Sequence, residues 1–116
     1  MHSPARILVV EDDSALRFVI CEVLREDNLF VVEMTNADAA LQYLKSTNHI
    51  DLIFTDVNMP GTMDGIELMK AVSEDFPEIK VVVTSGRPPP APMGAIPFIS
   101  KPYAVYSVLD KIRAAL

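Results

Sequence analysis

Acidic, hydroxyl and basic side chains stand at the ends of four apolar runs in this sequence, at positions far apart along the chain. Carboxylates come after the first and third runs, hydroxyls close the fourth, and an ammonium group follows the fifth. These residues are Glu11, Asp12, Asp13, Asp56, Thr84, Ser85 and Lys101. They are the kinds of group that act on anionic substrates, provided that the fold gathers the ends of the runs.

The carboxylates would repel one another if they met without a cation. Glu11, Asp12 and Asp56 offer oxygen ligands, and Mg²⁺ is typically held by one or two carboxylates together with water and phosphate oxygens. Zn²⁺ is not favoured, because the single cysteine and the two histidines lack the spacing of a zinc site. The acids therefore favour a hard divalent ion, Mg²⁺ in particular.

Phosphoryl transfer is the chemistry that this set fits. An aspartate beside a divalent ion can attack a phosphoryl group and form an aspartyl phosphate. The metal ion and Lys101 would offset the charge on the phosphoryl oxygens, and the hydroxyl of Thr84 would donate a hydrogen bond to one of them.

Each residue also has an ordinary structural explanation. Asp12 and Asp13 are suitable caps for a following helix, Asp56 for a turn at the end of a strand, and Lys101 for a solvated surface position. Taken singly, these explanations are at least as good as the chemical one. Four such coincidences in this order, at four strand ends, are much less probable, so the set as a whole favours the chemical explanation.

The elements that must position these residues alternate between strand and helix. Strand character is found at Arg6 to Glu11, Phe30 to Met34, Asp51 to Asp56, Ile79 to Ser85 and Pro97 to Ser100. Helical patterns lie between or after them, at Leu16–Leu24, 36–46, 64–76 and 104–116. The order predicts an α/β fold, a five-stranded parallel sheet with helices on both faces, whose site lies beyond the carboxyl ends of the strands.

Composition bounds the function further. The 116 residues fit one domain, and a net charge of -6 argues against direct binding of nucleic acid. No apolar run reaches the roughly 18 residues that span a membrane, and the start of the chain does not read as a signal peptide. Cys21 cannot form an internal disulfide, which suits a reducing cytoplasm, and its place in a helical pattern indicates a packing role.

The sequence resembles the receiver domains of bacterial two-component response regulators, the CheY-like family. The resemblance runs from Arg6 to about Leu116 and is carried by "ILVVEDDSALR", "DLIFTDVNMPGTMDGIEL", "VVVTSG" and "FISKPY". It implies a single receiver domain over residues 1–116 with the flavodoxin-like, doubly wound fold. It also implies a phosphorylatable signalling switch, whose only reactions are its own phosphorylation and dephosphorylation.

The resemblance assigns a role to each matching residue. Asp56 becomes the phosphoacceptor, served by a histidine kinase or a histidine phosphotransfer protein. Mg²⁺ is held by Asp12 directly, by Glu11 through water, by Asp56, and by the backbone carbonyl of Asn58, whose side chain lies where the family tunes dephosphorylation. Asp13 is left as a helix cap.

Two further residues are expected to support the reaction and the switch. Thr84 matches the hydroxyl residue that moves toward the phosphoryl group, and Lys101 matches the family's lysine, with a cis bond to Pro102. The switch pair is Thr84 and Phe98.

The sequence departs from the family pattern in three places. Phe98 replaces a frequent Tyr and offers no hydroxyl to a partner. "MPGTMDG" is one residue longer than the commonest form, which should alter the loop over the site. Pro88, Pro89 and Pro90 oppose a helix, so we expect the family's fourth helix to be shortened or replaced by a stiff proline-rich loop between Arg87 and Gly94.

Two alternatives stay open. One is an interaction module that keeps the receiver fold but acts without phosphorylation. The other is a Mg²⁺-dependent phosphatase or phosphotransferase that forms an aspartyl phosphate, although its usual second aspartate is replaced here by Asn58. The downstream partner is not identified by the sequence, and neither a nucleic acid nor a membrane is expected.

Overall fold

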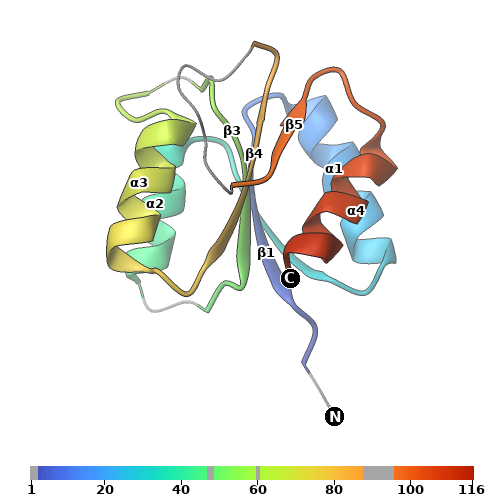
Figure 1. Ribbon diagram of the computed structural model, residues 1–116, viewed down its shortest axis with the longest axis horizontal. Helices are drawn as coiled ribbons and strands as arrows, with labels where there is room; N and C mark the ends of the chain where they lie inside the picture. Colours follow the sequence, from blue (N-terminus) through green and yellow to red (C-terminus); the bar gives the residue numbers. More distant parts are fainter. Residues whose placement is uncertain (1–2, 47–48, 60, 88–95) are drawn as a thin grey trace.

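The computed structural model describes residues 3–46, 49–59, 61–87 and 96–116 (Figure 1). Strands and helices alternate along most of the chain, as the sequence predicts. In chain order they are β1 (Arg6–Val10), α1 (Ser14–Glu26), β2 (Phe30–Met34), α2 (Ala37–Lys45), β3 (Leu52–Asp56), α3 (Gly65–Asp75), β4 (Lys80–Ser85), β5 (Phe98–Ser100) and α4 (Val105–Ala115).

The five strands form one parallel sheet in the order β2-β1-β3-β4-β5. Helices α1 and α4 cover one face and α2 and α3 the other (Figure 1). This confirms the predicted doubly wound fold. The strand order reverses between β1 and β3, and ligands of such sheets bind at that point, beyond the carboxyl ends of the strands.

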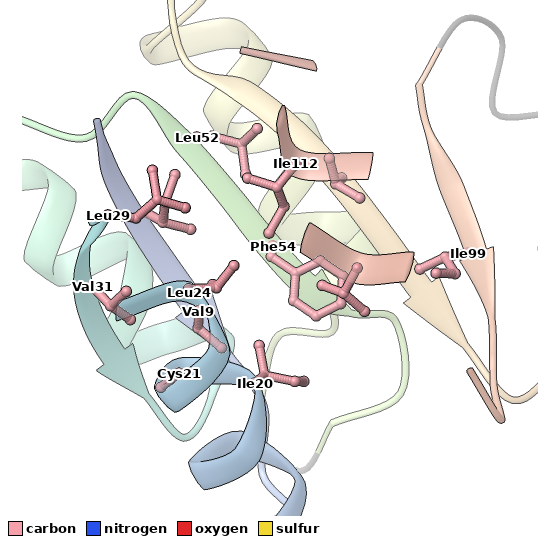
Figure 2. Packing of buried hydrophobic residues seen from close by; sticks show 13 residues of the cluster. Val9, Ile20, Cys21, Leu24, Leu29, Val31, Leu52, Phe54, Ile99 and Ile112 are labelled. Atoms are coloured by element: carbon pink, nitrogen blue, oxygen red, sulfur yellow. The ribbon is translucent and has the colours of Figure 1, made fainter. Parts of the chain in front are cut away.

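Two apolar layers hold the sheet between its helices. Under α1 and α4 the buried cluster includes Phe54 of β3 and Ile112 of α4, and Figure 2 shows these side chains meeting over the strands. Cys21 is fully buried in the same cluster, which confirms its packing role. A second cluster, which includes Leu8 and Leu68, fills the space under α2 and α3. Strands β1 and β3 are thus covered on both faces, which explains their unbroken apolar sequences.

Side-chain hydrogen bonds cap the N-termini of the first three helices. Asp13 accepts a hydrogen bond from the amide of Leu16 (3.0 Å) at the start of α1, and Asn36 does the same at the start of α2. Asp64 and Glu67 form a reciprocal capping box at the start of α3. The carboxylate of Asp13 is therefore committed to α1, as expected for a cap.

The predicted proline-rich loop in place of the family's fourth helix falls on residues 88–95, which lie outside the described residues, so it stays a prediction. On either side of that range, residues 86–87 and 96–97 are not helical. In the lengthened loop after β3, Gly61 has a φ of +110°, and Thr62 donates a hydrogen bond to Asp38 of α2 (2.7 Å). The loop is thereby anchored to a neighbouring helix.

Gly65, the first residue of α3, packs directly against the end of β3. A Cβ atom at this position would overlap the carbonyl oxygen of Asp56 and lie 2.8 Å from the Cα of Val57. The amide of Gly65 also donates to the carbonyl of Val57 (2.9 Å). Only a residue without a side chain lets α3 begin this close to Asp56.

We expect Gly65→Ala to lower the free energy of unfolding by about 1–3 kcal/mol, the usual cost of forcing atoms into a packed site. Urea denaturation would measure the loss. Gly86→Ala is the control, because a Cβ there meets nothing within 4 Å in the described part of the chain. Equal stabilities of the two variants would show that Gly65 is not needed for the close approach of α3.

Candidate functional site

The residues singled out from the sequence converge at the carboxyl edge of the sheet. Glu11 follows β1, Asp56 ends β3, and Lys101 follows β5. One carboxylate oxygen each from Glu11, Asp12 and Asp56 lies within 4.8 Å of the others. The parallel sheet brings these positions together because the carboxyl ends of all its strands share one edge.

Lys101 is the cation of this cluster. Its Nζ donates to Oδ2 of Asp56 (2.6 Å) and to Oε1 of Glu11 (3.0 Å). The lysine side chain is 24% exposed, whereas those of Glu11 and Asp56 are 1% and 6% exposed. The alternative of a solvated surface lysine is therefore wrong, because Lys101 reaches inward and joins two buried carboxylates.

The pKa values of Glu11 and Lys101 follow from the burial of the two side chains and from their hydrogen bonds. Burial raises the pKa of Glu11, and hydrogen bonds from the amide of Asp13 and from Lys101 offset only part of that effect. Burial alone would lower the pKa of Lys101, but its hydrogen bonds with Asp56 and Glu11 prevail, and the pKa lies above its usual value. Lys101 is thus a permanent cation over the physiological pH range.

Both oxygens of the Asp56 carboxylate are held. Lys101 binds Oδ2, and the amide of Asn58 donates to Oδ1 (3.0 Å). Asp56 faces Thr84 of β4 in the sheet register, which brings the end of β4 beside it. The two hydrogen bonds hold the Asp56 carboxylate in one orientation.

The other predicted residues lie around this carboxylate. Thr84 is fully buried, and its hydroxyl donates to the carbonyl of Ile99 in β5 (2.7 Å), so the structure directs it at β5 and not at Asp56. Phe98 is half-buried at the start of β5, and the Lys101–Pro102 bond is cis, as expected.

Two residues near the site, Ser85 and Tyr103, make contacts that the sequence did not predict. The hydroxyl of Ser85 accepts a hydrogen bond from the side-chain amide of Asn58 (3.1 Å), a contact that the run of hydroxyls at the end of β4 could have suggested. Tyr103 packs edge to face on Phe54, with ring centroids 6.4 Å apart. Its buried hydroxyl has no hydrogen-bond partner within the described part of the chain, and burial raises its pKa to about 12.

The donor set suits Mg²⁺. Lys101 binds Glu11 and Asp56 but has no ion pair with the exposed Asp12 in the described part of the chain, so the three carboxylates outnumber the cation bonded to them. All three acids present oxygen ligands, which a hard cation prefers. The residues therefore fit a divalent ion that completes the charge balance begun by Lys101.

Comparisons with known proteins agree with this geometry. The family model described as "Response regulator receiver domain" matches residues 7–113. The heme response regulator HssR of Staphylococcus saprophyticus is 29% identical over 115 residues, which cover 94% of this chain and 50% of HssR. The response regulator FleR of Pseudomonas aeruginosa is 32% identical over 114 residues, 93% of this chain and 24% of FleR.

A solved structure agrees as well. The CheY-like receiver domain protein of Methanospirillum hungatei JF-1 superposes with a TM-score of 0.85 at 26% identity, over 97% of this chain and 93% of that one. The chain thus spans nearly all of the chain in that structure but half or less of the two regulators. No helix in the described ranges is long and apolar enough to cross a membrane.

The raised pKa of Glu11 leads to a pH prediction for the metal-free protein. Because the folded-state pKa lies above the ordinary 4.5, the charge on Glu11 costs stability, and the cost appears as the pH rises from about 4.5 through the folded-state pKa. Glu11→Gln removes this cost, and Lys101 still has its ion pair with Asp56. We expect the variant to exceed the wild type in free energy of unfolding at pH 7, by a margin that shrinks toward pH 4.

Urea denaturation in a chelator at several pH values would measure this difference. Glu22→Gln, which changes an exposed acid of α1, should leave the pH profile unaltered. A Glu11→Gln variant that is less stable than the wild type at pH 7 would contradict the prediction.

Proposed function

The chain belongs to the family of response regulator receiver domains, and from this premise we propose that it accepts a phosphoryl group on Asp56. Receiver domains are signalling switches, and the phosphorylatable function of the family fits the site. The observation that carries the proposal is the Asp56 carboxylate at the end of β3, held by Lys101 and Asn58 beside the acids Glu11 and Asp12.

The proposed donor is a phosphohistidine on a histidine kinase or a histidine phosphotransfer protein. An oxygen of Asp56 attacks phosphorus, the bond from phosphorus to the imidazole nitrogen breaks, and its electron pair stays on that nitrogen, which then takes up a proton. Lys101 stays close enough to offset the charge that develops on the phosphoryl oxygens. The contribution of Asn58 is to hold Asp56 in one orientation.

Mg²⁺ is the proposed cofactor. Glu11, Asp12 and Asp56 would hold it with the backbone carbonyl of Asn58, and when bound it would supply positive charge next to the phosphoryl oxygens. The cluster of the three carboxylates supports this assignment.

The proposed switch runs through the β4–β5 pair. Thr84 faces Ile99 in the register and donates to its carbonyl, while Phe98 faces the preceding residue, Val83. If the Thr84 hydroxyl turns to a phosphoryl group on Asp56, it must give up Ile99, and the packing beside Phe98 changes. A downstream protein that prefers the altered surface then binds the phosphorylated form.

The remaining proposals concern the setting of the switch. Residues 1–116 would form a single receiver domain located in the cytoplasm. Its only reactions would be the phosphorylation of its own Asp56 and the hydrolysis of the resulting aspartyl phosphate. The net charge of -6 supports a protein rather than a nucleic acid as its direct partner.

The two alternatives are less well supported by the site. Burying the charged groups of Asp56, Glu11 and Lys101 costs stability, because their desolvation is only partly offset by pairing. A module that acts without phosphorylation would gain nothing from this cost. A phosphatase of the aspartyl-phosphate type would use a second aspartate two residues after the nucleophile, where this chain has Asn58.

We expect Asp56→Asn to abolish phosphorylation by acetyl phosphate and Mg²⁺, because an amide oxygen does not attack phosphorus as a carboxylate does. Intact-protein mass spectrometry would detect the added phosphoryl group. Asp13→Asn is the matched control: the same change two residues from Glu11 should leave uptake intact, since Asn caps a helix as well as Asp.

Mapping of the modified residue completes the test. A chelator should suppress uptake by the wild type, since Mg²⁺ would no longer offset the phosphoryl charge. Uptake by Asp56→Asn at the wild-type rate, or no uptake by the wild type from any phosphodonor, would refute the proposed function.

A further inference from the structure

Arg17 of α1 contacts the turn that carries two of the proposed metal ligands. Its Nη1 donates to the backbone carbonyl of Glu11 (2.8 Å), and its Nε pairs with Oε1 of Glu33 in β2 (3.3 Å). The side chain is 17% exposed. The guanidinium therefore uses two of its donors within the protein and joins α1, β2 and the end of β1.

Glu33 is held from its other side as well. Its Oε2 accepts from Nη2 of Arg25 (3.1 Å), and Arg25 also donates to the carbonyl of Val31 in β2 (3.3 Å). Because Arg17 and Arg25 lie about two turns apart on α1, the carboxylate of Glu33 bridges them along one side of the helix. The support for Arg17 therefore comes from outside the turn that it holds.

Asp12 depends on this turn for its direction. It is exposed, and its side chain makes no hydrogen bond within the part of the chain that the structure describes. The planar peptide group before it contains the carbonyl of Glu11, which Arg17 holds. The amide of Asp13, just after it, donates to Oε2 of Glu11 (3.1 Å). Arg17 thus fixes one of the two peptide groups that direct the Asp12 side chain.

We propose that Arg17 is a positioning residue for the Mg²⁺ ligands, which holds the peptide group between Glu11 and Asp12 so that the two carboxylates are presented together. The inference rests on the proposed function and its cofactor. An ion then meets carboxylates that are already in place, and its binding does not have to order the turn. Groups that hold metal ligands through hydrogen bonds commonly raise metal affinity in this way.

The charge of Arg17 acts in the opposite direction. A guanidinium at the carbonyl of Glu11 repels a divalent cation, so by charge alone Arg17→Ala would tighten the binding of Mg²⁺. Loss of the bond to Glu11 releases the turn and weakens the binding. The sign of the change therefore separates positioning from electrostatics. A loss of overall stability produces neither change, because the affinity measured is that of the folded protein.

The test is a Mg²⁺ titration of the folded chain at pH 7, followed by nuclear magnetic resonance of the backbone amides around Asp12 and Asp56. We expect Arg17→Ala to raise the Kd for Mg²⁺ about 10-fold, the low end of the effect of removing a group that holds a metal ligand. Arg113→Ala is the matched control. It removes the same charge and an ion pair with Asp27 at the far end of α1, and it should keep the wild-type Kd.

A second variant decides the matter if Arg17→Ala does not fold. Glu33→Gln weakens the support of Arg17 and should raise the Kd for Mg²⁺ about 2- to 5-fold, in keeping with the loss of one partly exposed ion pair. Glu22→Gln removes the same charge from an exposed position of α1 and should leave the Kd unchanged.

The outcomes are distinct. An unchanged or lower Kd in Arg17→Ala overturns the inference, and so does a Kd in Glu33→Gln that is no higher than in Glu22→Gln. In both cases Mg²⁺ binding and phosphoryl uptake by the wild type leave the proposed function intact. A wild-type spectrum that Mg²⁺ leaves unchanged would refute the proposed cofactor, and the inference would fall with it.

Discussion

The carboxyl edge of the sheet depends on one buried ion cluster, in which the ammonium of Lys101 joins the carboxylates of Asp56 and Glu11. These acids are almost fully buried, and a carboxylate in that position is costly unless a cation is paired with it. Lys101 lies 45 residues from Asp56 and 90 from Glu11 along the chain. The cluster therefore forms only when β1, β3 and β5 lie in their final order.

The surrounding contacts restrict what the cluster can do. Gly65 lets α3 begin against the carbonyl of Asp56, and the amide of Asn58 fixes one oxygen of its carboxylate. Thr84 and Ser85, at the end of β4, are bonded to different neighbours, one to β5 and the other to the loop after β3. The end of β4 thus contacts both β5 and the loop that carries Asn58, on either side of the Asp56 carboxylate.

The fold could be predicted from the sequence because its signals are local. The apolar runs placed the strands within a residue or two of their bounds, and Asp13 caps α1 as expected. The meeting of Glu11, Asp12, Asp56 and Lys101 could be predicted because the carboxyl ends of parallel strands share one edge. The sequence left open whether Lys101 is a solvated surface residue or part of the site, since a single lysine is usually solvated.

Contacts that depend on sheet register could not be foreseen. The bond from Thr84 to Ile99 requires knowing that β5 pairs with β4 in a particular alignment. The Asn58–Ser85 bond requires that the loop after β3 lie against β4, and the role of Gly65 requires the distance from α3 to the Asp56 backbone. None of these contacts has a sequence pattern that would predict it.

The sharpest test of the central claim, that Asp56 accepts a phosphoryl group, is nuclear magnetic resonance of the protein with Mg²⁺ and beryllofluoride, which resembles a phosphoryl group on a carboxylate. The account predicts amide shift changes around Asp56 and Thr84 and at Lys101; an unchanged spectrum at these residues would contradict it.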